Sequence, residues 1–249
     1  MSRKLILALT AAACLGATPV VFAKDAAPAA YVSAAVADAG RPEADKARDA
    51  ARKPAEMLAF AEVKPGQKVL EIIPGGGYFT RLLSKAVGPT GKVYAAAAPG
   101  NGVTQLEPVT KDATYSNVQV IAPPLRAGAT VPEPVDVIFT AQNYHDLHLA
   151  QLKLDVPAAN KALFDALKPG GILLVIDHAA VAGAPLTVAD SLHRIDPAVA
   201  RAEIEAAGFQ YVGESDVIRN PADPKTANVF DAAIRGKTDQ FVYKFKKPG

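Results

Sequence analysis

The chain has 249 residues, half of them hydrophobic, and carries 27 Lys and Arg against 25 Asp and Glu. This nearly balanced charge gives no reason to expect a nucleic-acid partner, and the length suits one domain with a sizeable core. The one cysteine, Cys14, lies close to the start, so the rest of the chain cannot form a disulfide and must rely on a buried core for its stability.

The first residues have the pattern of a secretory signal. A positively charged start precedes an apolar run from Leu5 to Leu15, and Val21-Phe22-Ala23 ends the segment with suitable residues for signal peptidase. The pattern predicts a signal peptide over residues 1–23 and an exported protein, periplasmic or secreted. The apolar run is shorter than the roughly 20 residues that span a bilayer, so no stable membrane insertion is expected after cleavage. Lipid attachment at Cys14 is disfavoured because the three residues directly before it are alanines, without the larger aliphatic residue usually found there.

Residues 24–40 are rich in Ala and Pro and are predicted to be a flexible lead-in. One α/β domain is expected over residues 41–249. It begins with helical pieces at Glu43–Arg52 and Ala55–Phe60, which are separated by Pro54.

Beyond residue 64, short apolar runs bounded by turn residues alternate with helical patterns. The predicted strands are Val69–Ile73, Gly91–Ala97, Val118–Ile121, Val135–Thr140, Gly171–Asp177, Phe209–Val212 and Gln240–Phe245. The predicted helices are Tyr78–Val87, Pro157–Leu167, with Asp155 near its start, and Pro197–Ala207. This alternation predicts a doubly wound, largely parallel sheet with helices on both faces, whose ligands bind at the carboxyl ends of the strands.

A glycine-rich turn, Pro74-Gly75-Gly76-Gly77, follows the first strand. Such a turn allows a ligand to approach the backbone closely at the N-terminus of a helix. The same residues also serve a plain tight turn, so the motif by itself leaves both interpretations open.

The surroundings of this turn resemble the class I S-adenosylmethionine-dependent methyltransferases. The segment Val69 to Thr80 resembles their first motif, Leu167 to Leu173 the turn into their fifth strand, and Ala206-Ala207-Gly208-Phe209 a turn into a late strand. The resemblance extends over most of the chain beyond Pro54 and suggests an exported branch of predicted methyltransferases. It implies a Rossmann-like seven-stranded sheet with the last strand antiparallel, and S-adenosylmethionine as cofactor. By position match, the cofactor contacts would be Glu71, Gly75, Gly76, Gly77 and Tyr78.

The chain departs from the family pattern at three places. Ile73 stands where the first motif usually has glycine. The acid that usually follows the second strand, and binds the ribose hydroxyls, is replaced by Ala95–Ala98, with Ala97 at the expected contact. Ala122-Pro123-Pro124 follows the third strand, where the family often has an acid near the adenine. These departures leave open a degenerate member that binds a small ligand without catalysis.

The four histidines of the chain are expected at the strand ends where ligands bind. His145 and His148 follow the fourth strand, His178 follows Asp177 at the end of the fifth, and His193 lies in the next segment. A histidine oriented by an acid suits a general base, either His145 with Asp146 or His178 with Asp177. Loop hydrogen bonding or a metal site, in which His145 and His148 share one helical face, are the alternatives.

The resulting hypothesis is an S-adenosylmethionine-dependent methyltransferase acting on a small-molecule substrate. Its catalytic residues would be His145, Asp146, His148, Asp177 and His178, and no metal is assigned. Asn143, after the fourth strand, would face the methyl group, with Tyr144 beside it. A histidine-based metal-dependent enzyme is the second alternative.

Overall fold

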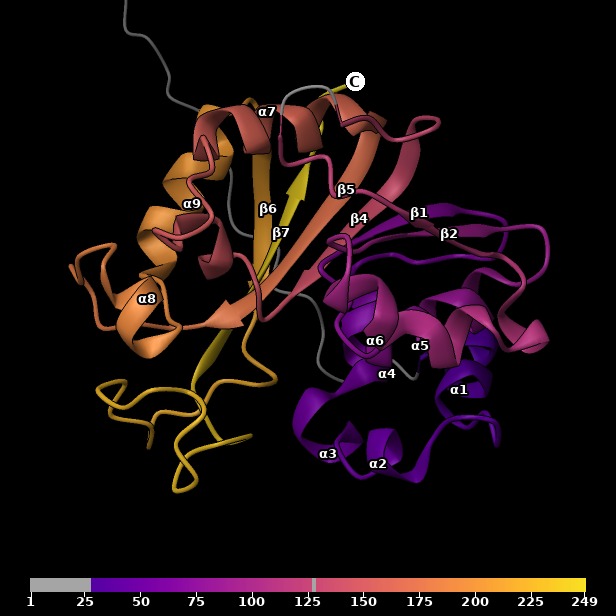
Figure 1. Cartoon of the computed structure of the whole chain (residues 1–249), viewed down its shortest axis with the longest axis horizontal. Coiled ribbons are helices and arrows are strands. Elements are labelled where there is room, and N and C mark those ends of the chain that lie inside the picture. The colour runs from indigo at the N-terminus through magenta and orange to yellow at the C-terminus, as the bar shows by residue number, and fades with distance from the viewer. Residues whose placement is uncertain (1–27, 127–128) are drawn as a thin grey trace, which may run out of the picture.

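The computed structural model describes residues 28–126 and 129–249, and the predicted signal peptide lies outside them. Seven strands form one sheet in the order β3-β2-β1-β4-β5-β7-β6 (Figure 1). The strands are β1 (Lys68–Ile72), β2 (Lys92–Ala96), β3 (Val118–Ile121), β4 (Val135–Ala141), β5 (Leu167–His178), β6 (Gln210–Ser215) and β7 (Gln240–Lys246).

Strands β1 to β5 pair in parallel, and β7 runs antiparallel to both β5 and β6. The doubly wound Rossmann-like sheet with an antiparallel last strand is therefore confirmed. The order of strands reverses between β1 and β4, and this is where a sheet of this kind binds its ligand.

Helices cover both faces of the sheet, as Figure 1 shows. The helices are α1 (Ala30–Val36), α2 (Glu43–Lys46), α3 (Asp49–Arg52), α4 (Pro54–Phe60), α5 (Tyr78–Val87), α6 (Asn101–Thr110), α7 (Val156–Ala166), α8 (Val188–Leu192) and α9 (Pro197–Ala206), with short 3-10 turns η1 (Ala113–Tyr115) and η2 (His145–His148). Asp155 caps α7 by accepting a hydrogen bond from the Ala158 amide, as its position predicted.

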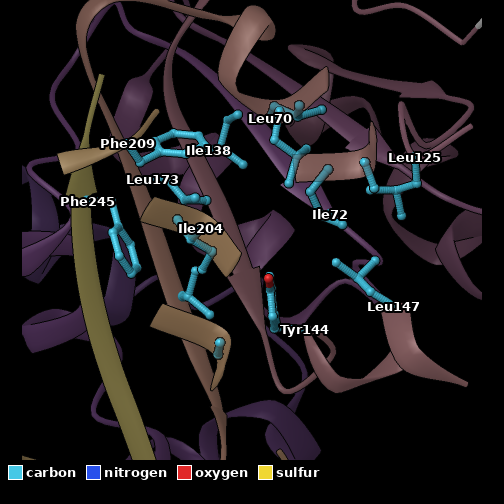
Figure 2. Packing of buried hydrophobic residues seen from close by; sticks show 14 of the residues in the cluster. Leu70, Ile72, Leu125, Ile138, Tyr144, Leu147, Leu173, Ile204, Phe209 and Phe245 are labelled. Atoms are coloured by element: carbon cyan, nitrogen blue, oxygen red, sulfur yellow. The ribbon is translucent and has the colours of Figure 1, made fainter. Parts of the chain in front are cut away.

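Two large apolar clusters, and a smaller one under α6, fill the space between the sheet and its helices. One lies under α7 and α9, where Figure 2 shows Ile204 and Phe209 against strand residues such as Leu173. The other lies under α1, α4 and α5. The alternation of side chains along buried strands supplies both clusters, because successive residues point to opposite faces. No helix in the described part of the chain combines the length and apolar character needed to cross a membrane.

The helix α1 corrects the expectation of a flexible lead-in for residues 28–40, whereas residues 24–27 lie outside the described part of the chain. Val32 and Ala35 are almost fully buried against the cluster that contains α5, and the Tyr31 hydroxyl donates to the Val63 carbonyl at 3.0 Å. The alanine-rich composition of the segment hid this packing, because few large apolar residues mark its buried side. Two other helices, α6 and α8, were likewise not predicted.

Candidate active site

The glycine loop lies at the reversal between β1 and β4 and opens helix α5. Gly75 and Gly77 have φ angles of 55° and 80°, in the left-handed region that glycine tolerates. Apart from the adjoining residues of the chain, no atom of the described residues lies within 4 Å of where a Cβ on Gly75 or Gly76 would stand. At Gly77 a Cβ would lie 2.5 Å from Val109 Cγ2 on α6. The first two glycines therefore border open space, whereas the third packs under α6.

This open stretch of backbone leaves room for S-adenosylmethionine, since a ligand can approach the main chain there without meeting a side chain. Arg81 stabilises the loop through hydrogen bonds to its carbonyl groups. Its Nη1 donates to the carbonyls of Gly76 and Gly77 at 2.9 and 3.1 Å and pairs with Asp45 at 3.1 Å. The loop thus has a fixed shape without a ligand.

Ile73, which stands where the family usually has glycine, has a left-handed backbone of the kind that glycine adopts readily. Its φ is 51°, a left-handed value that is costly for a β-branched residue. Its amide donates to the Ala96 carbonyl at 3.1 Å, and its side chain packs against the core cluster under α7 and α9. Packing and hydrogen bonding therefore hold this residue in a strained backbone.

Glu71 and Tyr78 lie inside the protein rather than on the open side of the loop. The Thr80 hydroxyl donates to Glu71 Oε2 at 2.6 Å, and burial raises the pKa of Glu71 to about 8. The Tyr78 hydroxyl donates to Asp49 at 2.6 Å, and the guanidinium of Arg52 stacks on its ring at 4.6 Å. Tyr78 therefore stacks on its own protein, which differs from the predicted contact with a ligand.

The end of β2 is apolar. Ala97 is buried in a cluster with Leu106 and Val109 of α6, and no acid stands at the position where the family binds the ribose. Any nucleoside held here must rely on backbone groups and apolar surface at this strand end.

Asn143 joins the ends of the two strands at the reversal. Its Nδ2 donates to the carbonyls of Ile72 and Ile73, both at 3.0 Å, and its Oδ1 accepts from the Thr140 hydroxyl. Because these side-chain bonds go to the protein, Asn143 acts here by positioning the glycine loop.

Asp177 pairs with His145, which corrects the suggested pairing of Asp177 with His178. The other suggested pair, His145 with Asp146, is present, with Nε2 and Oδ1 3.2 Å apart. The fully buried Asp177 accepts from the His145 amide at 2.6 Å and from His145 Nδ1 at 2.9 Å. His178 instead contacts the Thr238 hydroxyl through Nδ1 at 2.8 Å. Successive residues of a strand point to opposite faces, so Asp177 and His178 point apart, and the carboxylate of Asp177 points towards His145 beyond the end of β4.

The two histidines have opposite electrostatic environments. Burial lowers the pKa of His145, but the carboxylates of Asp177 and Asp146 outweigh it and raise that pKa to about 10. Burial lowers the pKa of His178 to about 4. Burial by itself would raise the pKa of Asp177, but the charge of His145 and the hydrogen bond from it outweigh this and lower that pKa.

His148 lies outside this cluster. Its Nε2 contacts Glu203 of α9 at 3.0 Å, and the hydroxyl of Tyr144 donates to the same carboxylate at 3.1 Å. Figure 2 shows Tyr144 among the core side chains. Among the residues that the structure describes, no metal-binding group contains both His145 and His148, so the structure does not bring these two together as the metal-site alternative required.

His193 is the residue that the sequence interpretation left without a role. Its Nδ1 lies 3.3 Å from Nε2 of His145, and Nε2 of His145 lies 3.2 Å from Oδ1 of Asp146. A parallel bridge between Ala179 and Ile195 folds the chain after β5 back along the strand end and brings His193 there. Apart from its place on the predicted ligand-binding edge, no local pattern marked it.

A cavity of about 530 Å³ lies elsewhere, beside β6, and is lined by residues that include Arg201, Arg219 and Lys225. Arg219 and Lys225 both pair with Asp239, and Arg201 pairs with Glu205. Its cations are already paired, and none of the residues predicted for the site lines it; those residues lie at the glycine loop and the adjoining ends of β4 and β5.

Comparisons with known proteins agree with this geometry. The sequence profile of the family described as protein-L-isoaspartate(D-aspartate) O-methyltransferase matches residues 22–180. A protein-L-isoaspartate O-methyltransferase from Methanosarcina mazei is 30% identical over 128 residues, 49% of this chain and 45% of that protein. A ubiquinone/menaquinone biosynthesis C-methyltransferase from Neisseria meningitidis is 30% identical over 173 residues, 67% of this chain and 65% of that protein. The chain spans about half the length of the isoaspartate relatives that it matches.

Solved structures show the same fold. A methyltransferase from Aquifex aeolicus, described as S-adenosylmethionine-dependent, superposes with a TM-score of 0.58 at 22% identity, covering 83% of this chain and 98% of that one. Fibrillarin from Aeropyrum pernix, solved with natively bound S-adenosylmethionine, superposes with a TM-score of 0.50 at 15% identity, covering 80% of this chain and 76% of its own. Because the profile matches more than half of the chain, this protein belongs to the protein-L-isoaspartate(D-aspartate) O-methyltransferase family.

Proposed function

We propose that this protein binds S-adenosylmethionine along the open backbone of Gly75 and Gly76 and methylates the carboxylate of an isoaspartyl residue. The observation that carries the first part is the space over these two glycines at the reversal between β1 and β4. When bound, S-adenosylmethionine supplies an electrophilic methyl group. The family description supports the isoaspartyl acceptor.

A carboxylate acceptor suits a site whose contribution is positioning. Carboxyl groups have pKa values of about 4, so at neutral pH the acceptor already carries its lone pair and needs no general base. The protein then has to hold cofactor and acceptor in line. Asn143 serves this end by fixing the glycine loop to the end of β4 through the Ile72 and Ile73 carbonyls.

The apolar end of β2 sets the expected mode of nucleoside binding. With Ala97 in place of the family's acid, the ribose loses a charged hydrogen-bond partner worth about 1.5–3 kcal/mol. We therefore expect weaker binding of S-adenosylmethionine than in relatives that keep the acid.

The binding test uses a substitution that fills the open space without strain. The backbone of Gly76 does not have the positive φ of its neighbours, so Gly76→Leu should fold normally and project its side chain over the loop. Calorimetric titration with S-adenosylmethionine and its demethylated product should show binding to the wild type, weaker binding to Gly76→Ala and none to Gly76→Leu. Equal binding by the leucine variant would remove the loop from the site.

The acceptor is tested separately. Transfer of labelled methyl groups to an isoaspartyl peptide is compared with transfer to the same peptide containing normal aspartate. Selective labelling of the first supports the proposal. Cofactor binding without transfer to either peptide would contradict the acceptor and favour the degenerate ligand-binding alternative.

We also propose that the protein is exported, on the strength of residues 1–23 alone. N-terminal sequencing of protein recovered from the native host should begin at Lys24. A start at Met1, or recovery only with the cytosolic fraction, would contradict export.

A further inference from the structure

A group of three potential metal ligands lies where β4 and β5 end. It consists of His145 Nε2, Asp146 Oδ1 and His193 Nδ1, and it is the one group of at least three such side chains found within residues 28–126 and 129–249. His145 and Asp146 come from η2, and His193 ends α8. The methyltransferase activity proposed above assigns no role to it.

The spacing of the three atoms matches a metal site. They are separated by 3.2 Å, 3.3 Å and 4.0 Å, so a point exists about 2.1 Å from all three. Bonds of Zn²⁺ to imidazole nitrogen and carboxylate oxygen are about 2.0–2.2 Å long. The three donor atoms are therefore spaced so that one ion can reach all of them at ordinary bond lengths.

Asp177 provides the outer support that metal-binding histidines usually have. Its carboxylate accepts from His145 Nδ1 at 2.9 Å, which leaves Nε2 of His145 facing the other two ligands. A histidine that donates its second nitrogen to a carboxylate is fixed in both orientation and tautomer. The Asp177 carboxylate is itself held by the amides of His145 and His178 at 2.6 and 2.7 Å.

The charges around the group favour a cation. Two carboxylates, Asp146 and Asp177, face His145, whereas Arg194, the nearest arginine in sequence to His193, pairs with Asp223 instead. The side chains of Asp146 and His193 are 24% and 26% exposed, so an ion can enter from solvent. Phe230 packs against the His193 ring, with centroids 4.9 Å apart, and limits its movement.

We propose that His145, Asp146 and His193 bind one divalent transition-metal ion, with Asp177 as the residue that positions His145. Two imidazoles and one carboxylate favour Zn²⁺ and its neighbours over Mg²⁺ or Ca²⁺. Three protein ligands leave a fourth position open to water or to an oxygen of a substrate, at the edge of the sheet where the acceptor is expected to bind.

Cobalt titration tests this directly and does not depend on methyl transfer. The full chain, purified without a histidine tag and treated with chelator, is titrated with Co²⁺, and binding is followed by calorimetry and by visible absorption. We expect one ion per chain, with the intense absorption of a four- or five-coordinate site, and competition by Zn²⁺. No binding, or a stoichiometry well below one, would overturn the proposal.

Variants identify the ligands. His193→Ala should weaken Co²⁺ binding at least about tenfold, and Asp177→Asn about 10- to 100-fold, in the range seen when outer-shell partners are changed. His148→Gln is the matched control, because this imidazole contacts Glu203 and should leave binding unchanged. Wild-type affinity in His193→Ala, or an equal loss in His148→Gln, would contradict the assignment. Circular dichroism of each variant confirms that it is folded.

Discussion

The carboxyl group of Glu71 lies under the glycine loop, and its burial should make the stability of this protein fall as pH rises. Glu71 is 4% exposed, and its pKa rises from an ordinary 4.5 to about 8. Between these two values the unfolded chain loses the proton while the folded protein keeps it. Unfolding is therefore favoured more strongly at each higher pH, by about 1.4 kcal/mol per unit.

Replacing Glu71 by Gln isolates this effect. The variant keeps the shape and an oxygen that accepts from Thr80, but it has no proton to lose. Below pH 4.5 the wild type and variant should differ by a constant. Between pH 4.5 and about 8 the wild type should lose stability relative to the variant, by about 5 kcal/mol in total. Above that range the difference should be constant again, because both states of the wild type are ionised.

The assay is urea unfolding of ligand-free protein, followed by circular dichroism at pH values from about 4 to 9. The quantity of interest is the difference in unfolding free energy between the two proteins, since other titrating groups contribute to both alike. A difference that does not change with pH would refute the reasoning. It would mean that Arg52 and Arg81, which lower this pKa, hold the carboxylate ionised throughout.

Three further predictions concern packing and are tested by urea unfolding. Gly77→Ala should cost about 1–3 kcal/mol, because its Cβ would collide with Val109 of α6; a loss well below 1 kcal/mol would contradict the collision. Asn143→Ala should cost about 1–3 kcal/mol and weaken S-adenosylmethionine binding, because two strand-end carbonyls lose their donor; unchanged binding would show that the loop does not need this residue. Arg194→Met should cost about 3–5 kcal/mol by leaving Asp223 buried without its partner, and Asp223→Leu in the same chain should restore part of this; no recovery would contradict a pairwise effect.

Much of the fold could be predicted from local sequence. Each strand was predicted to within a few residues, and α5 was predicted with its full bounds of Tyr78–Val87. These elements carry dense apolar runs or a clear helical period, and turn residues bound them. Helices α1 and α6 were not predicted, since alanines dilute the pattern of the first and Pro108 lies inside the second.

The site could be predicted only in part. The glycine loop and the ends of β4 and β5 were expected on one edge of the sheet, and β1, β4 and β5 indeed run parallel. The partners of the individual side chains could not be deduced. Asp177 at the end of β5 contacts His145 of η2, beyond the end of the neighbouring strand β4. His148 contacts Glu203 of α9, and Arg52 of α3 covers the ring of Tyr78.

By itself the sequence determined the order of strands and helices, the glycine loop and the absence of a carboxylate after β2, because each of these depends on neighbouring residues along the chain. Only the tertiary structure decided which two of the three glycines border open space. It alone also brought His193 next to His145 and Asp146. Those contacts join segments about 30 to 50 residues apart, and they depend on how α6 packs and how the chain folds back after β5. Local preferences along a chain carry no information about such distances.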